Sequence, residues 1–255
     1  MRDLFAVAGK VALVTGGSRG IGRMIAHGLV ANGVRTYLTS RKAEACQQAA
    51  VELSREGECI ALPADLAKAE ERARVVAELG AREPRLHILV NNAGANWGAP
   101  LAEFPESGWD KVFDLNLKAV FFLTRDLVPL LERAATVVDP ARVVNIGSID
   151  GLHVPLLDTF SYSAAKAALH HLTRVLARKL APRVTVNAIA PGPFESQMMK
   201  ATLDRFGDSI RSSNPRGRIG EPEDMAGTTI FLCSRAAAYV TGAVIPVDGG
   251  ISTCL

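Results

Sequence analysis

Short apolar segments alternate with helical segments along the whole chain, and this alternation restricts the fold more than any other feature. The apolar segments lack the regular polar positions of a half-exposed sheet, which indicates strands covered on both faces. Helices between such strands form right-handed crossovers, which makes the strands parallel. We expect strands at 10–15, 34–39, 59–62, 87–91, 142–147, 184–189 and 243–247. We expect the main helices at 20–32, 44–56, 68–80, 109–133, 160–180 and 222–234.

The pattern runs through all 255 residues without a linker, a repeat or a low-complexity segment. It predicts an α/β fold: a single doubly wound domain of the Rossmann type over residues 1–255, with a mostly parallel seven-stranded sheet and helices on both faces. Only residues 193–218 break the rhythm, with a short helix at 197–206 and a polar remainder. Such an insert after a strand end suggests a lid over a binding crevice, with an ordinary surface loop as the alternative.

Composition excludes several classes of function. The net charge is only +3 and no basic run occurs, so we expect neither nucleic acid nor a membrane as a partner. The N-terminal residues lack the apolar core and cleavage site of a signal peptide, and no apolar run is long enough to span a bilayer. The scattered cysteines, Cys46, Cys59, Cys233 and Cys254, predict reduced thiols in a cytoplasmic protein without a metal site.

A glycine-rich turn joins the first expected strand to the first expected helix. Glycines let the backbone approach a pyrophosphate, and the helix N-terminus adds free N–H groups and the positive end of its dipole. A glycine-rich motif alone is weak evidence, but its place between a strand and a helix strengthens the prediction of a dinucleotide site. The expected contacts in this turn are Gly16, Ser18, Arg19, Gly20, Ile21 and Gly22.

The end of the second strand indicates which dinucleotide binds. An acidic residue there would bind the ribose 2′-hydroxyl of NAD, whereas arginine suits the 2′-phosphate of NADP. The segment reads Thr39-Ser40-Arg41-Lys42 and contains no acid, and Arg19 could reach the same phosphate. We therefore expect NADP(H), held in part by Ser40 and Arg41, with solvated surface cations as the alternative.

Tyr162 and Lys166 are one helical turn apart, so their side chains share a face of the expected helix 160–180. A free tyrosine has a pKa of about 10, and an adjacent ammonium is expected to lower it toward neutral pH. Ser148 ends the preceding strand, at the sheet edge where ligands bind, and its hydroxyl can hydrogen-bond a carbonyl oxygen. The tyrosine–lysine spacing is common by chance, and it gains weight from following Ser148 and the glycine-rich turn in this order.

Taken in order, these motifs resemble those of the short-chain dehydrogenase/reductase family over nearly the whole chain. The resemblance rests on Thr15-Gly16-x-x-x-Gly20-x-Gly22, Asp65-Leu66, Asn91-Asn92-Ala93-Gly94, Asn116, Ser148, Tyr162-x-x-x-Lys166, Pro191-Gly192 and Val247-Asp248-Gly249-Gly250. Within the family the chain looks most similar to 3-oxoacyl-carrier-protein reductases of the rhamnolipid type. It departs from the usual pattern by one extra residue between Ser148 and Tyr162, by Phe194 and by Ser196.

The resemblance implies a role for each catalytic residue. Tyr162 would be the general acid in carbonyl reduction, and Ser148 would orient the carbonyl. Lys166 would lower the pKa of Tyr162 and bind the nicotinamide ribose, and Asn116 would hold a water that links Lys166 to solvent.

The resemblance also implies further contacts with the cofactor. Asp65 would contact the adenine and Asn92 the ribose on the adenosine side. The Pro191-Gly192 turn and Ser196 would hold the carboxamide end of the nicotinamide. Leu66, Ala93 and Gly94 complete the implied set.

The implied reaction is the reduction of a 3-oxoacyl thioester to a 3-hydroxyacyl thioester by NADPH. Two alternatives stay open: a member of the same family acting on a small ketone, quinone, steroid or sugar alcohol, and an NADP(H)-binding sensor without catalysis. Residues 149–159 and 193–218 are expected to set specificity, with His153, Leu156 and Leu157 in the pocket wall.

The resemblance implies two kinds of protein partner. An acidic acyl carrier protein could dock on Arg133, Arg178 and Arg183 near the entrance, although ordinary solvated arginines are the favoured explanation. A second copy of the chain would pair through the long helices to give a homotetramer or homodimer. His170 and His171 have no third metal ligand spaced for them and are expected at the helix surface or at such an interface.

Overall fold

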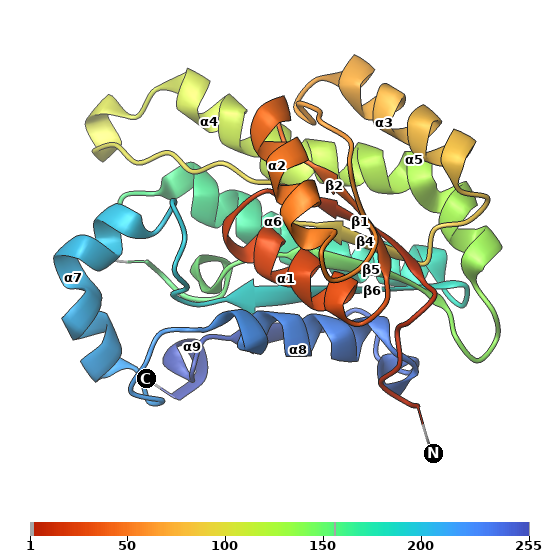
Figure 1. Ribbon diagram of the computed structural model, residues 1–255. Helices are drawn as coiled ribbons and strands as arrows, with labels where there is room; N and C mark the ends of the chain where they lie inside the picture. Colours follow the sequence, from red (N-terminus) through yellow and green to blue (C-terminus); the bar gives the residue numbers. More distant parts are fainter. Residues whose placement is uncertain (1–2, 156, 255) are drawn as a thin grey trace.

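The computed structural model describes residues 3–155 and 157–254, so Leu156, expected in the pocket wall, lies outside the described residues. The strands are β1 (Val11–Thr15), β2 (Arg35–Thr39), β3 (Cys59–Ala61), β4 (Ile88–Asn91), β5 (Ala141–Ile146), β6 (Val184–Pro191) and β7 (Val244–Val247). They form one sheet in the order β3-β2-β1-β4-β5-β6-β7, and all neighbouring pairs are parallel. The predicted seven-stranded doubly wound sheet is therefore confirmed (Figure 1).

Helices cover both faces of this sheet (Figure 1). One buried apolar cluster joins the sheet to α1 (Gly20–Ala31), α2 (Ala43–Leu53) and α8 (Pro222–Cys233). A second cluster joins it to α3 (Ala69–Arg82), α5 (Ala119–Ala134) and α6 (Phe160–Leu180). Alternate side chains of β1 enter opposite clusters, which is why this strand is apolar from Val11 to Val14.

Two helical regions differ from their predicted form. The helix expected at 109–133 consists of α4 (Glu106–Phe113), a π-helical turn (Asp114–Lys118) and α5. In the lid segment, α7 (Lys200–Ser213) begins later and is longer than the helix expected at 197–206. Short elements that the pattern did not predict are the 3-10 helices Leu101–Glu103, Ile149–Gly151 and Arg235–Ala237, and α9 (Ile251–Cys254).

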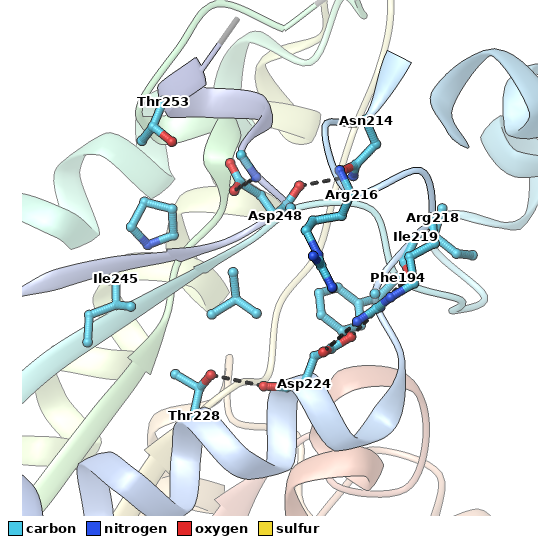
Figure 2. Close-up of a pocket in the computed structure, with 15 residues that line it drawn as sticks. Phe194, Asn214, Arg216, Arg218, Ile219, Asp224, Thr228, Ile245, Asp248 and Thr253 are labelled. Atoms are coloured by element: carbon cyan, nitrogen blue, oxygen red, sulfur yellow. Dashed lines mark hydrogen bonds and ion pairs between the residues drawn. The ribbon is translucent and has the colours of Figure 1, made fainter. Parts of the chain in front are cut away.

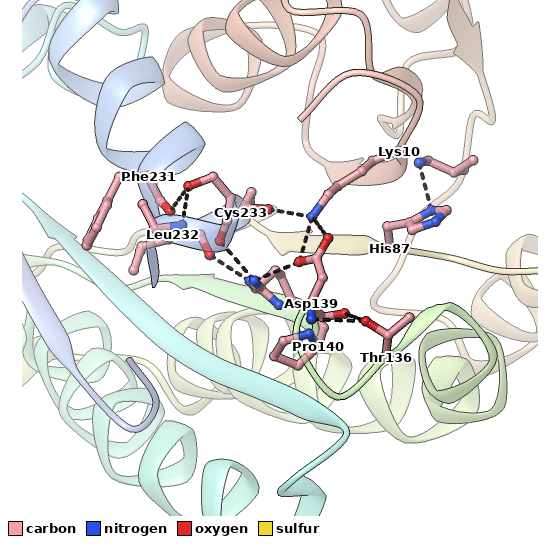
Figure 3. Close-up of polar contacts among 12 residues, drawn as sticks. Lys10, His87, Thr136, Asp139, Pro140, Phe231, Leu232 and Cys233 are labelled. Carbon is pink, nitrogen blue, oxygen red and sulfur yellow. Dashed lines mark hydrogen bonds and ion pairs between the residues drawn. The ribbon is translucent and has the colours of Figure 1, made fainter. Parts of the chain in front are cut away.

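A buried charge cluster ties together the edge of the sheet where the strands begin (Figure 3). Arg142 is only 1% exposed, and its guanidinium donates to the carbonyl oxygens of Leu232 at 3.1 Å and Ser234 at 2.8 Å. Asp139 accepts from Arg142 at 2.9 Å and pairs with Lys10 at 2.8 Å. The cluster thus anchors the end of α8 to the beginnings of β1 and β5, far from the strand carboxyl ends.

Within residues 3–155 and 157–254, no helix is both long enough and apolar enough to cross a membrane. The same residues contain no group of three or more His, Cys, Asp or Glu side chains placed to hold a metal ion.

Candidate active site

The glycine-rich turn and the loop after β4 are bound to each other at the carboxyl ends of the central strands. The Thr15 hydroxyl accepts from the backbone nitrogens of Asn92 and Ala93, each at 2.9 Å. The Asn92 amide nitrogen donates to the carbonyl oxygens of Thr15 at 2.9 Å and Gly16 at 3.2 Å. Two motifs far apart in sequence therefore form one rigid unit. Asn92 holds the turn in shape, and its predicted contact with the adenosine ribose stays a prediction.

Glycine is required at two positions of this unit. Gly16 has a φ of +66°, a conformation that other residues rarely adopt. Gly22 has no room for a side chain, because a Cβ there would lie 2.3 Å from the Asn92 amide nitrogen and from the Gly16 oxygen. The turn therefore brings backbone to the surface at the start of α1, as phosphate binding requires.

The N-terminus of α1 is free to bind an anion. Its N-cap residue, Arg19, makes no side-chain capping hydrogen bond, and the first turn contains no acidic residue. The first N–H groups of the helix therefore have no internal acceptor, and the dipole favours a negative charge there. Ile21 packs on the core, which fixes the helix against the sheet.

Polar and basic groups gather where the ribose of the adenosine is predicted to lie. Ser18 donates a hydrogen bond to the Ser40 hydroxyl at 2.9 Å, which joins the glycine-rich turn to the end of β2. Arg41 is exposed beside Ser40. Arg19 is also exposed and bonds to Gln197 of the segment after β6. No carboxylate occupies the end of β2, so the residues present fit a 2′-phosphate better than a 2′-hydroxyl.

Asp65 and Leu66 follow β3 at the same edge of the sheet. Asp65 is half-buried and accepts from the backbone nitrogen of Ala67 at 3.2 Å. Leu66 is buried in the second apolar cluster, so its side chain serves packing. The adenine contacts predicted for these two residues stay predictions.

The end of β6 brings the lid segment to the glycine-rich turn. Gly192 donates to the Val247 oxygen at 3.0 Å and has no room for a side chain, because a Cβ would lie 2.6 Å from Asp248 Cβ. Ser196 lies against Gly20: a Cβ placed on Gly20 would be 3.2 Å from the Cβ of Ser196. The Pro191-Gly192 turn and Ser196 thus lie on the cofactor side of the sheet, as the predicted nicotinamide contacts require.

Ser148 and Tyr162 lie together beyond the end of β5. Ser148 is buried, and its hydroxyl accepts from the Asp150 nitrogen at 3.1 Å. Burial raises the pKa of Tyr162 to about 12, and the Asp150 charge adds to this effect, whereas the neighbouring Ser148 hydroxyl acts to lower the pKa. The phenol is therefore held protonated beside the hydroxyl that can orient a carbonyl.

Lys166 lies over the ring of Tyr162 rather than at its hydroxyl. Its Nζ is 5.5 Å from the ring centroid and donates to the Ile146 carbonyl at 2.7 Å. Burial lowers the pKa of Lys166 to about 8, and the charge of Asp150 opposes this shift. Burial of the phenol raises the Tyr162 pKa in this structure, and the lowering of that pKa by Lys166 during the reaction stays a prediction.

Asn116 forms part of the π-helical turn between α4 and α5. Its side-chain oxygen accepts from the Ala95 nitrogen at 2.8 Å and its side-chain nitrogen donates to the Ala95 oxygen at 2.9 Å. Gly94 has little space beside this amide, since a Cβ would lie 3.3 Å from the amide oxygen. The amide thus holds the loop after β4, and the relay from Lys166 to solvent through Asn116 stays a prediction.

Two residues beside the site were not predicted to lie there. Asp150 follows Ser148 in the 3-10 turn, and burial raises the pKa of its carboxyl while Lys166 and His153 act to lower it. His170 is only 3% exposed, so its expected place at a helix surface or interface is wrong. His171 is exposed. An acid two residues after Ser148 was a visible signal, but the burial of His170 depends on packing that periodicity does not resolve.

The three arginines expected near the entrance lie instead at the end of the sheet where the strands begin, opposite the strand carboxyl ends. Arg183 directly precedes β6, and its oxygen accepts from Ala141 at the start of β5. Arg133 and Arg178 are in the last turns of α5 and α6, which run antiparallel to the strands. Their expected role in docking a carrier protein at the entrance is therefore wrong.

A separate cavity of about 460 Å³ lies between β7, the start of α8 and the end of the lid segment (Figure 2). Two of its charged groups have partners: Arg218 pairs with Asp224 at 2.6 Å, and Asp248 accepts from the Ser252 hydroxyl at 2.6 Å. Phe194 fills one wall, and none of Ser148, Tyr162 or Lys166 reaches it. This cavity is distinct from the catalytic constellation.

Comparison with known proteins agrees with this site. A family model described as enoyl-(acyl carrier protein) reductase matches residues 16–252. The rhamnolipids biosynthesis 3-oxoacyl-[acyl-carrier-protein] reductase of Pseudomonas aeruginosa is 48% identical over 98% of this chain and 99% of its own length. Galactitol 2-dehydrogenase of Cereibacter sphaeroides is 38% identical over 98% of this chain and 97% of its own.

The solved structures include a near match. The Pseudomonas aeruginosa RhlG/NADP active-site complex superposes with a TM-score of 0.95 at 47% identity, covering 99% of this chain and 100% of that one. Sequence and fold agree along nearly the entire length, and the chain belongs to the short-chain dehydrogenase/reductase family.

Proposed function

We propose that the protein is an NADPH-dependent carbonyl reductase that converts a 3-oxoacyl thioester into a 3-hydroxyacyl thioester. The observation that carries the proposal is the pairing of Ser148 with a protonated, half-buried Tyr162 at the carboxyl end of β5. The relative at 48% identity bears the name of a 3-oxoacyl-[acyl-carrier-protein] reductase.

NADP(H) is the proposed cofactor. The bare N-terminus of α1, the Ser18–Ser40 pair and the exposed Arg41 support a site for a dinucleotide with a 2′-phosphate. The Pseudomonas aeruginosa structure, solved as an NADP complex, supports the same assignment. NADPH supplies a hydride when bound. The test is the ratio of kcat/KM for NADPH and NADH, and a preference for NADH would overturn the assignment.

The residues of the chain then divide the work of reduction. Ser148 donates a hydrogen bond to the substrate oxygen and so orients the carbonyl. Tyr162 gives its proton to that oxygen as negative charge develops there. Lys166 stabilises the phenolate that remains, and we propose that Asn116 positions the water that restores the proton.

The substrate atom that receives the proton distinguishes the reduction of a ketone from the reduction of an enoyl thioester. Reduction of a ketone delivers a proton to oxygen, whereas reduction of a carbon–carbon double bond delivers it to carbon. Two neighbouring hydroxyls, from Ser148 and Tyr162, suit an oxygen. We therefore favour 3-oxoacyl reduction, although the matching family model is described as an enoyl reductase.

Apolar side chains at the mouth favour an acyl chain over a sugar. Leu152, Val154 and Leu157, after the Ser148 turn, are 42%, 89% and 49% exposed. Met198, in the proposed lid at 193–218, is 49% exposed. A polyol would leave these surfaces in water, whereas an acyl chain would cover them. The second candidate, a small ketone or sugar alcohol, keeps the support of the galactitol 2-dehydrogenase match.

A substrate panel separates the candidates. The oxidation of NADPH is followed with acetoacetyl and longer 3-oxoacyl thioesters, a crotonyl thioester, simple ketones and tagatose. The proposal requires the highest kcat/KM for a 3-oxoacyl thioester, and a higher value for the crotonyl thioester would overturn it. Tyr162→Phe should bind NADPH but lose turnover. A non-catalytic sensor would bind NADPH and reduce no member of the panel.

We also propose a cytoplasmic homotetramer or homodimer, with an acyl carrier protein as the donor of substrate. Exposed apolar side chains on α4, α5 and α6 support a second copy as partner: Trp109 (41%), Phe121 (38%) and Val175 (51%). Phe121→Glu should lower the molar mass measured by light scattering. An unchanged molar mass would show that Phe121 is not in the interface. A monomeric wild-type protein would exclude the proposed oligomer.

A further inference from the structure

His170 is a buried titratable side chain that the proposed mechanism does not use. It lies on α6 one turn after Lys166 and is 3% exposed. Neither ring nitrogen makes a well-formed hydrogen bond among the described residues, although the Gly151 backbone lies close enough to act against the lowering of its pKa. A polar group buried without a partner costs stability, so the contacts of the ring must account for this histidine.

The ring is wedged against the turn that carries Ser148. A Cβ at Gly147 would lie 2.1 Å from Nε2 of His170, and a Cβ at Gly151 would lie 2.9 Å from its Cε1. Neither glycine has a positive φ, so the backbone conformation would accept alanine at both positions. At Gly147 the imidazole is the nearest group that excludes a side chain.

Gly151 also rests on the backbone of α6, because a Cβ there would lie 2.8 Å from the Lys166 carbonyl carbon. The turn is therefore supported at both ends, by the ring of His170 at Gly147 and by the helix at Gly151. Ser148 lies between these supports, and Tyr162 belongs to the same helix as the ring. Burial and the nearby Lys166 lower the pKa of His170 to about 4, so the ring is neutral.

We propose that His170 is a positioning residue, whose ring holds the Ser148 turn at the distance from Tyr162 that proton transfer to the substrate requires. The inference rests on the proposed carbonyl reduction. A displacement of about 1 Å in a catalytic constellation can cost roughly 100-fold in rate, so a wedge of this kind has a measurable effect.

The first test is His170→Ala with a 3-oxoacyl thioester. We expect kcat to fall by roughly 10- to 100-fold while the Kd for NADPH is unchanged, because Ser148 moves and the nucleotide turn does not. His171→Ala is the matched control, since His171 is the next residue and is exposed; its kcat should equal that of the wild type. An unchanged kcat in His170→Ala would overturn the proposal.

A double-mutant cycle asks whether His170 acts through Ser148. In a Ser148→Ala background, His170→Ala should lower kcat no further, because the hydroxyl that it positions is gone. An equal loss in both backgrounds would reject the positioning role and leave the proposed function intact. Full activity of Ser148→Ala and Tyr162→Phe would instead reject the proposed function itself.

A compensating pair keeps the test decisive if the His170 variant folds poorly. Gly147→Ala alone should lower kcat, because the new methyl group displaces the ring or the turn. Gly147→Ala combined with His170→Ala should recover kcat relative to Gly147→Ala, since the methyl group then occupies space that the ring has left. If the double variant is no better than Gly147→Ala, the ring is not what restrains the turn.

Discussion

Gly22 is where the glycine-rich turn, α1 and Asn92 meet, and Gly22→Ala is expected to disturb all three. A Cβ there would lie 2.3 Å from both the Asn92 amide nitrogen and the Gly16 carbonyl oxygen. One of these atoms belongs to the backbone and cannot rotate away. The Asn92 amide must then move, and it loses its hydrogen bonds to Thr15 at 2.9 Å and Gly16 at 3.2 Å.

The loss can be sized from these contacts. Two hydrogen bonds contribute about 1 kcal/mol each. Overpacking a filled site costs about 1–3 kcal/mol. Alanine recovers about 1 kcal/mol of helix propensity. The free energy of unfolding of Gly22→Ala should therefore fall by about 2–4 kcal/mol. Binding of NADPH should weaken as well, because the displaced atoms form its proposed phosphate site.

Gly227→Ala is the matched control, since Gly227 also lies within a helix, α8, and a Cβ there would have no atom within 4 Å. It should raise the free energy of unfolding by about 0.5–1 kcal/mol and leave NADPH binding unchanged. Both quantities are measured by urea denaturation at one fixed protein concentration and by fluorescence titration with NADPH. A Gly22→Ala variant with wild-type stability and affinity would refute the reasoning, as would two variants that shift in the same direction.

Two further predictions concern charges at the two edges of the sheet. The kcat/KM for reduction should fall above about pH 8, where Lys166 loses its positive charge. Asp150→Asn should move this fall to lower pH, because the Asp150 carboxylate raises the pKa of Lys166. A pH–rate profile of both proteins measures the shift. Arg142→Met should lower the free energy of unfolding by about 2–5 kcal/mol, since it leaves the buried carbonyl oxygens of Leu232 and Ser234 without a donor at about 1–3 kcal/mol each. Arg211→Met, in an exposed pair, should cost less than about 1 kcal/mol in the same denaturation experiment, and equal losses would contradict the burial argument.

Much of the fold was predictable because its causes are local in the sequence. α6 begins and ends at the predicted residues, and each predicted strand appears within a few residues of its expected bounds. Strands covered on both faces must be apolar throughout, and that requirement is visible without coordinates. The order of the motifs placed Ser148, Tyr162 and the glycine-rich turn at one edge for the same reason.

The parts that could not be predicted depend on contacts between distant segments. The π-helical turn coincides with the pairing of the Asn116 amide with Ala95, and no periodicity reports such a contact. The arginines at 133, 178 and 183 were assigned to the entrance by their charge, although their place at helix ends and before a strand puts them at the opposite edge. The burial of His170 between two glycines likewise requires the folded turn.

The pKa of Tyr162 separates two accounts of the acid–base step. The sequence predicted a pKa near neutrality, whereas burial in the structure raises it to about 12. The equilibrium of the reaction releases one proton on oxidation, so the ratio of oxidation to reduction must change about tenfold per pH unit whatever the enzyme does. A tyrosine that stays protonated leaves reduction flat below about pH 8 and places the whole dependence on oxidation.

The two accounts predict different pH dependences of kcat/KM between about pH 5.5 and 7.5, a range below the pH at which Lys166 loses its charge. With the phenol protonated throughout, kcat/KM for the 3-oxoacyl thioester is constant, and kcat/KM for oxidation of the 3-hydroxyacyl thioester rises about tenfold per pH unit. A tyrosine that titrates near neutral pH would make oxidation level off and reduction decline within the same range. Initial rates in both directions over this range distinguish the two, and a plateau in oxidation below about pH 7.5 would show that Lys166, not burial, controls the phenol during the reaction.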